Sequence, residues 1–229
     1  MDEGSATLDA VSGSGEAGVP TSVPDTVARV AARLFAERGY EATSVREIVE
    51  AARVTKPTLY YHFGSKEGLA QALLVLPQAV LVEEMRTILA READPVVALE
   101  ALLERLFEFC REDPDRARLM FAVAFGPLGA DLAGKVKQCG CVIDEFWEAA
   151  IARLAATGLV ATERVPALVL AVRGLHIIYI LEFLYKGRAL GREVAREIVR
   201  DLLVGFGEPA EARAYLNGSS PGGVGASGE

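Results

Sequence analysis

The sequence is poor in the side chains on which most enzymes and metal proteins depend. It has only two histidines and three cysteines in 229 residues. It contains no phosphate-binding loop and no spaced cluster of metal ligands. We therefore predict that the chain is not an enzyme and has no cofactor or metal. An enzyme is the main alternative class, and little in the sequence supports it.

A long hydrophobic run is also missing. No apolar run exceeds seven residues, and the one at residues 175–181 includes a histidine, so all are far too short to cross a bilayer. The N-terminus is acidic and rich in Gly and Ser, which does not fit a signal peptide. These features predict a cytoplasmic protein that does not interact with a membrane.

Cysteine is scarce and odd in number, with no secretory context, which predicts free thiols. Cys139 and Cys141 lie two residues apart in a predicted helix, so they point to nearly opposite sides and cannot easily chelate one metal. A redox role for these two residues or for Cys110 is kept as an alternative.

The chain as a whole lacks an excess of positive charge. Its net charge is −8, although residues 24–70 carry seven basic against six acidic side chains. An acidic majority limits non-specific binding to nucleic acid. A structural protein that coats DNA therefore fits less well than a protein with one narrow DNA-binding surface.

That surface is predicted in residues 43–69, T-S-V-R-E-I-V-E-A-A-R-V-T-K-P-T-L-Y-Y-H-F-G-S-K-E-G-L. Ser44 is a good N-cap for a short helix whose apolar residues recur with helical spacing through Ala52. A turn at Arg53 and Val54 follows. Thr55 then caps a second helix, which has Pro57 in its first turn.

In the second helix Leu59 and Phe63 are four residues apart and are predicted to point inward. Lys56, Pro57 and Tyr60 are thereby turned outward together. A cation and apolar atoms at a helix N-terminus suit the major groove of DNA, where they meet guanine edges and thymine methyl groups. Ser65 is predicted to cap a third helix. Lys66 lies in the first turn of that helix, where it fits a nearby phosphate.

The stretch resembles the DNA-binding domain of the tetracycline-repressor (TetR) family of bacterial regulators. The family pattern runs I-A, A-G-V-S, T-L-Y-x-H-F and S-K-E-x-L, and the resemblance covers about residues 23–69. Two departures stand out: Val49 replaces the usual Ala, and Arg53 replaces the Gly of the turn. If Arg53 adopts a positive φ, the strain is on the order of 1 kcal/mol, while its charge lies close to the DNA face.

The resemblance assigns roles to two groups of residues. The first group is expected to face base edges or the nearby backbone: Arg46, Lys56, Pro57, Thr58 and Tyr60. The second group is expected to hold phosphates: Ser44, Thr55, Tyr61, His62 and Lys66.

The rest of the chain predicts further helices, so the expected fold is all-α. It comprises an N-terminal three-helix helix-turn-helix domain, residues 23–70, and a C-terminal helical ligand-binding and dimerisation domain, residues 71–207. Residues 1–22 and 208–229 are rich in small and polar residues and are predicted to be disordered tails. A long helix from about residue 65 to 92 contains Pro77, which predicts a kink. Thr162 is predicted to cap a very apolar helix, and a last helix spans about residues 192–206.

The last two long helices carry more apolar residues than one partner layer easily covers. This predicts a homodimer held by a four-helix bundle, as in the family, with Ile198, Leu202 and Phe206 at the interface. The alternative is that this whole apolar surface belongs to the core of one chain.

The middle helices are expected to surround a small-molecule cavity. Its predicted lining is Leu106, Phe109, Cys110, Phe121, Trp147, Arg173, His176 and Tyr179. For each aromatic residue the alternative is ordinary core packing. Arg173 is expected to pair either with an anionic ligand or with an acid such as Glu182. His176 and Tyr179 are polar groups on an apolar helix and need partners when they are buried.

Together these features predict a dimeric, ligand-responsive transcriptional regulator. We expect a repressor that binds a palindromic operator in double-stranded DNA and is released by a small apolar or amphipathic effector. The alternative within the same class is a DNA-binding regulator that is controlled by redox chemistry or by another protein.

Overall fold

The computed structural model describes residues 22–125 and 130–207, and in these residues the fold is all-α. A single isolated β-bridge joins Val160 to Gly207. Both predicted tails, apart from Ser22, lie outside the described residues. The helices are α1 (Val23–Arg38), α2 (Val45–Ala52), α3 (Lys56–Phe63), α4 (Lys66–Arg91), α5 (Pro95–Glu112), α6 (Pro114–Phe125), α7 (Ala130–Ala156), α8 (Val165–Lys186) and α9 (Arg192–Phe206).

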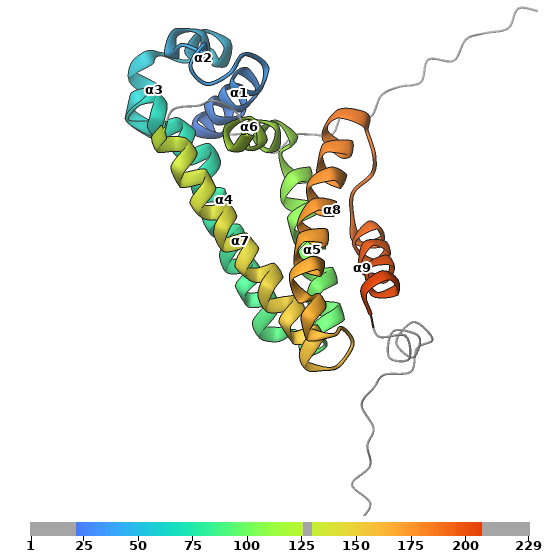
Figure 1. Cartoon of the computed structure of the whole chain (residues 1–229). Coiled ribbons are helices and arrows are strands. Elements are labelled where there is room, and N and C mark those ends of the chain that lie inside the picture. The colour runs from blue at the N-terminus through green and yellow to red at the C-terminus, as the bar shows by residue number, and fades with distance from the viewer. Residues whose placement is uncertain (1–21, 126–129, 208–229) are drawn as a thin grey trace, which may run out of the picture.

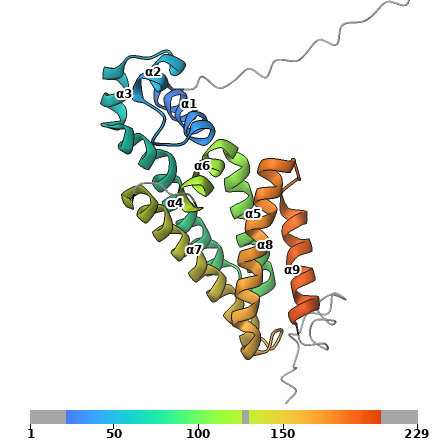
Figure 2. The ribbon, with the colours of Figure 1, turned by 45° about the horizontal axis from the view of Figure 1, so that its top comes forward.

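The helices form a small group at one end and a larger bundle below it (Figure 1). Helices α1, α2 and α3 make up the small group, and α4 runs from it into the bundle alongside α7. Helices α5, α8 and α9 form the other side of the bundle, while α6 lies between the bundle and α1 (Figures 1 and 2).

A first hydrophobic cluster holds the small group together. It buries Phe35 of α1, Ile48 of α2 and Leu59 of α3, each fully inaccessible to solvent. The inward position predicted for Leu59 is therefore confirmed. This cluster continues past residue 70, because Leu119 and Val123 of α6 pack into it.

A second, larger cluster fills the bundle. It contains residues of α4, α5, α7, α8 and α9, with Phe107 and Trp147 among the largest fully buried side chains. On α4 the members of the first cluster end at Leu74 and those of the second begin at Leu81. Met120 of α6 packs against both clusters, so α6 contacts both parts of the molecule.

Pro77 lies inside α4, between the segments that serve the two clusters. The helix continues through this position, although proline supplies no N–H for the backbone bond. The next residue, Gln78, is buried, and its side-chain oxygen has no hydrogen-bond partner. The kink expected at Pro77 stays a prediction.

Ser44, Thr55 and Ser65 cap α2, α3 and α4 as predicted. Ser22, which was placed in the N-terminal tail, instead caps α1, Asp94 caps α5, and Gly39 ends α1 with a positive φ. The prediction for Thr162 was wrong. A short 3-10 turn, Thr162–Arg164, precedes α8, and no side chain caps this helix. Pro166 in the first turn needs no cap because it has no N–H to satisfy.

Candidate nucleic-acid interface

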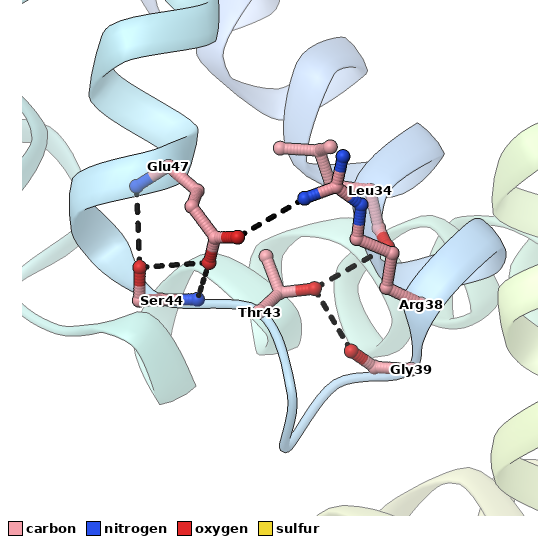
Figure 3. A network of polar contacts seen from close by, with 6 residues as sticks. All are labelled: Leu34, Arg38, Gly39, Thr43, Ser44 and Glu47. Carbon is pink, nitrogen blue, oxygen red and sulfur yellow. Dashed lines mark hydrogen bonds and ion pairs between the residues drawn. The ribbon is translucent and has the colours of Figure 1, made fainter.

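The start of α2 is fixed by a polar network that joins it to α1 (Figure 3). The Ser44 hydroxyl accepts the Glu47 backbone N–H at 3.2 Å, and the Glu47 carboxylate accepts the Ser44 backbone N–H at 2.8 Å. Arg38 of α1 reaches the same carboxylate at 3.0 Å. The bonds from the Ser44 backbone, its hydroxyl and then Arg38 lower the pKa of Glu47. The network therefore sets the orientation of α2 against α1.

Thr43, which the sequence analysis overlooked, belongs to the same network. Its hydroxyl donates to the carbonyl oxygens of Leu34, at 3.3 Å, and Gly39, at 2.9 Å, and the side chain is fully buried. It thus ties the start of α2 to the end of α1 (Figure 3). A threonine directly before an N-cap serine was the only signal in the sequence, and it is a weak one.

The turn between α2 and α3 is closed by backbone bonds. Arg53 has φ 56° and ψ 41°, in the left-handed region, as expected for a residue in the place of a glycine. Thr55 caps α3 by accepting the Thr58 backbone N–H at 3.3 Å, and its hydroxyl lies 2.8 Å from that of Thr58. Pro57 occupies the first turn, where it leaves no donor unpaired.

The outward face of α3 carries the predicted residues. Lys56 and Pro57 are exposed, Tyr60 is 47% exposed and Tyr61 is 86% exposed. His62 is exposed as well, and its ring lies 5.0 Å from that of Tyr61, centroid to centroid. These side chains form an exposed aromatic surface on α3 that is open to a binding partner.

Several predicted phosphate ligands already have partners within the chain. The hydroxyl groups of Ser44 and Thr55 serve as helix caps. Arg46, which was predicted to face base edges or the nearby backbone, also has a partner, because it pairs with Glu50 at 2.7 Å on the exposed side of α2. Lys66 lies 4.3 Å above the Tyr40 ring, and its Nζ is 3.4 Å from the Glu41 carbonyl oxygen. Tyr40 was not in the predicted site, and it orients this lysine near the start of α4.

The first turn of α4 requires a glycine at residue 68. A Cβ on Gly68 would lie 2.0 Å from the Phe63 carbonyl oxygen, so no other residue fits without a shift of the backbone. Ser65 caps α4 by accepting the Gly68 N–H at 2.9 Å. The close approach places the N-terminus of α4 beside the C-terminus of α3.

The predicted ligand residues lie in or near the second cluster. Leu106, Phe109, Cys110 and Trp147 are buried, and Phe121 is partly buried. The rings of Trp147 and His176 approach to 5.4 Å between centroids. Burial raises the pKa of the Cys110 thiol to about 12, which keeps it protonated and unreactive near neutral pH.

The polar side chains of this set differ in the partners that they have within the chain. Arg173 pairs with Asp144 of α7 at 2.8 Å, and Tyr179 lies under the Arg188 guanidinium at 4.5 Å. His176 Nδ1 donates to the Val172 carbonyl oxygen at 3.2 Å, and burial lowers the His176 pKa to about 4. Among the residues that the structure describes, the buried indole nitrogen of Trp147 has no hydrogen-bond partner.

An open groove lies elsewhere, on α4 and α5. Its volume is about 630 Å³, and its lining includes Val80, Ile88 and Arg105. None of the predicted ligand residues lines it. Within residues 22–125 and 130–207, no group of three or more His, Cys, Asp or Glu residues could hold a metal ion.

Comparison with known proteins places this geometry in a family. A family model described as "Bacterial regulatory proteins, tetR family" matches residues 28–73. The HTH-type transcriptional activator FasR of Mycolicibacterium smegmatis is 34% identical over 140 residues, which are 57% of this chain and 64% of FasR. The HTH-type transcriptional repressor KstR2 of Rhodococcus jostii is 40% identical over 95 residues, 42% of this chain and 45% of KstR2. The chain thus spans less than two thirds of the length of either relative.

A solved structure extends the likeness over most of the fold. The TetR family transcriptional regulator PfmR from Thermus thermophilus is 29% identical and has a TM-score of 0.67. The match covers 80% of this chain and 96% of that one. The N-terminal sequence match, the arrangement of α1–α3 and the helical bundle agree: residues 28–73 carry the sequence pattern of the TetR family, and the described helices share the fold of a TetR family regulator.

Proposed function

We propose that this protein is a cytoplasmic transcriptional regulator that binds DNA through α3. The observation that carries the proposal is the exposed face of Lys56, Pro57 and Tyr60 at the start of a short helix on a well-packed three-helix core. A lysine there reaches guanine O6 and N7, and the proline ring and tyrosine contact thymine methyl groups. Residues 23–70 act as the DNA-binding part and residues 71–207 as the part for dimerisation and effector binding.

The protein acts as a homodimer, and the face of α8 and α9 that remains exposed is its interface. Ile198 and Leu202 are only 2% and 5% exposed in one chain because they pack in its own core. They therefore offer little surface to a second copy, and we propose the exposed face of α8 and α9 in place of the interface predicted from the sequence. Phe206 is partly buried beneath the Arg164 guanidinium, at 4.9 Å.

The exposed apolar side chains lie on another face of α8 and α9. Leu170, Ile178 and Tyr185 on α8 and Val204 on α9 are each more than half exposed. Gly174 lies midway between Leu170 and Ile178 and is exposed too, so two copies of α8 could approach closely there. Helices α8 and α9 run side by side at one edge of the molecule (Figure 2). Symmetric pairing of that edge buries this apolar surface.

The same surface explains the unusual hydropathy of this segment. Thr162–Lys186 is long and apolar enough to cross a membrane by length and composition alone. One such helix is weak evidence for a membrane span, because core helices of soluble proteins pass the same test. Arg173, which pairs with Asp144 of α7, stands in the middle of this segment, as expected for a helix that packs against protein.

The effector is a neutral, mostly apolar molecule that binds next to Trp147 and His176. A neutral His176 that donates from Nδ1 leaves Nε2 as an acceptor, and the Trp147 indole N–H is a donor without a partner. A ligand hydroxyl could accept from Trp147 and donate to His176. Because Trp147 is fully buried, the helices around it must separate to admit the ligand.

Repression by occupancy of a promoter is the proposed mode of regulation. The relatives include a protein named as an activator, FasR, and one named as a repressor, KstR2. The position of the operator relative to the promoter therefore determines the sign of the effect. A reporter gene behind the selected DNA sequence tests it: repression predicts higher expression when the regulator is deleted.

The test of DNA binding is selection from a random pool of duplexes, followed by footprinting. We expect one enriched sequence with two-fold symmetry. Its half-sites should be about 34 Å apart, or a multiple of that distance, because a dimer presents two copies of α3. Failure to enrich any sequence, with no retained duplex at low salt, would reject the proposed function.

A further inference from the structure

Arg53 holds a backbone conformation that L-residues with side chains rarely adopt. It is the only non-glycine residue with a positive φ in the described part of the chain, where the other such positions are Gly39, Gly64, Gly158 and Gly187. A side chain in the left-handed region collides with the following carbonyl oxygen, and glycine avoids this strain. Strain of this kind points to a role for the side chain that bears it.

The turn itself does not need an arginine. It is closed by two backbone bonds, from the Arg53 N–H to the Glu50 carbonyl oxygen at 3.3 Å and from the Val54 N–H to the Val49 carbonyl oxygen at 3.0 Å. Glycine would make both bonds without strain. The structure of the turn therefore explains the positive φ, but it does not explain the guanidinium group.

The side chain is placed for another partner. Arg53 is exposed and lies two residues before Thr55, the N-cap of α3. Within residues 22–125 and 130–207 no carboxylate comes within ion-pair distance of it, and Glu50, the acid nearest in sequence on α2, is taken by Arg46 at 2.7 Å. An unpaired cation thus stands beside the N-terminus of the helix that is proposed to enter DNA.

We propose that Arg53 binds a backbone phosphate of the DNA, next to the bases that α3 contacts. This inference rests on the proposed function and adds to it an anchor in the turn, where a glycine would offer only backbone. Arginine matches a phosphate with two parallel N–H donors. Each protomer contributes one such contact, so a dimer gains two.

A purely structural role predicts a different result. A cation at the C-terminus of α2 would interact favourably with the helix dipole, and its removal would lower Tm without changing DNA binding. A phosphate contact instead appears in the dependence of DNA affinity on salt, since each contact releases counterions from the duplex. The two readouts separate the roles.

The experiment compares Arg53→Asn, Arg53→Gly and Arg53→Lys with the unaltered protein. Asparagine and glycine tolerate the left-handed region and carry no charge, whereas lysine keeps the charge. The probe is the duplex that the unaltered protein selects from a random pool, titrated between roughly 50 and 300 mM salt. Arg111→Asn, at an exposed arginine of α5, is the control for lost net charge.

We expect the neutral variants to reduce the slope of log K against log salt by about 2 per dimer and the affinity by roughly tenfold at physiological salt. Arg53→Lys should retain most of the slope, and Arg111→Asn all of it. An unchanged slope in both neutral variants overturns the inference, as does a loss in Arg53→Lys as large as in Arg53→Asn. If Lys56→Ala weakens binding while the neutral Arg53 variants do not, only this inference fails. If the unaltered protein retains no duplex, both this inference and the proposed function fail.

Discussion

The small N-terminal group of helices and the larger bundle differ in how their residues are used. In α1–α3 two eight-residue helices are held by caps, a buried threonine and a few fully buried side chains, so that exposed residues such as Tyr60 have a fixed position. In the bundle the helices are long and mostly aliphatic, and polar groups such as His176 and Trp147 are buried among them. The first region fixes a surface, whereas the second encloses polar groups that lack full partners. Helices α4 and α6 contact both clusters, so a change in one cluster can reach the other through them.

The largest loss of stability is expected when a side chain of the small N-terminal cluster is truncated. This change tests whether the N-terminal helices and the bundle are stabilised separately. Phe35→Ala should lower the free energy of unfolding by about 3–5 kcal/mol, because the small cluster cannot collapse around the cavity. Hydrogen exchange should accelerate in α1–α3 and α6 more than in α9. Phe107→Ala, at an equally buried residue of the second cluster, is the matched control and should affect α5 and α9 instead. Equal acceleration throughout the chain after either change would mean that the two clusters are one cooperative unit.

The next effect concerns the edge formed by α8 and α9. Ile178→Glu should weaken the dimer by about 3 kcal/mol, since it places an unpaired charge in each half of the interface. Analytical ultracentrifugation should show a folded monomer. Val80→Glu makes the same kind of change at an exposed apolar residue of α4 and should leave the dimer intact. Leu202→Glu, in contrast, should unfold the single chain, and a stable monomer of that variant would restore the interface first predicted from the sequence.

These two regions were not equally predictable from the sequence. The caps at Ser44 and Thr55 and the inward position of Leu59 follow from local chemistry and helical spacing, and all three are confirmed. The positive φ of Arg53 followed from its place in the family pattern. Which side of an apolar helix faces its own chain depends on tertiary packing, so Ile198 and Leu202 were placed at an interface although they belong to the core.

Side-chain partners over long sequence distances were equally inaccessible. The ion pair of Arg173 joins α8 to Asp144 of α7, whereas the sequence offered an anionic ligand or an acid such as Glu182. The position of Lys66 over Tyr40 depends on how α4 meets the loop after α1. Periodicity identifies the buried stripe of a helix, but it contains no information about which residue of another helix lies opposite.

The free energy of unfolding should depend on pH through His176, which lies in the bundle and not in the N-terminal helices. The pKa of His176 falls from 6.5 to about 4 because the ring is buried. Between these values the unfolded chain binds a proton that the folded chain does not, so stability is complete above about pH 6.5 and decreases as the pH drops toward 4. The loss should be on the order of 2 kcal/mol. Chemical denaturation across this range should show a flatter profile for His176→Gln, and an unchanged profile would contradict the burial of a neutral imidazole.

The smallest effect separates two roles of Ser44. Ser44→Ala should lower the free energy of unfolding by about 1 kcal/mol, because the cap of α2 is lost. Ser44→Asp keeps the cap and should retain stability, yet its charge should weaken DNA binding if a phosphate lies close to this helix end. Thermal unfolding and DNA titration of both variants provide the comparison. Normal DNA affinity of Ser44→Asp would mean that Ser44 acts only as a cap.

The most direct test of the central claim is the affinity of Tyr60→Ala for the selected duplex and for a scrambled duplex of the same length. Tyr60 is half exposed on α3 and lies outside the core, so the variant should remain folded. We predict that binding of the selected duplex weakens by about 1–3 kcal/mol while binding of the scrambled duplex hardly changes. Leu76→Ala, at an exposed residue of α4, should alter neither affinity. Full affinity and an unchanged footprint for Tyr60→Ala, together with Lys56→Ala, would contradict the assignment of α3 as the helix that reads DNA.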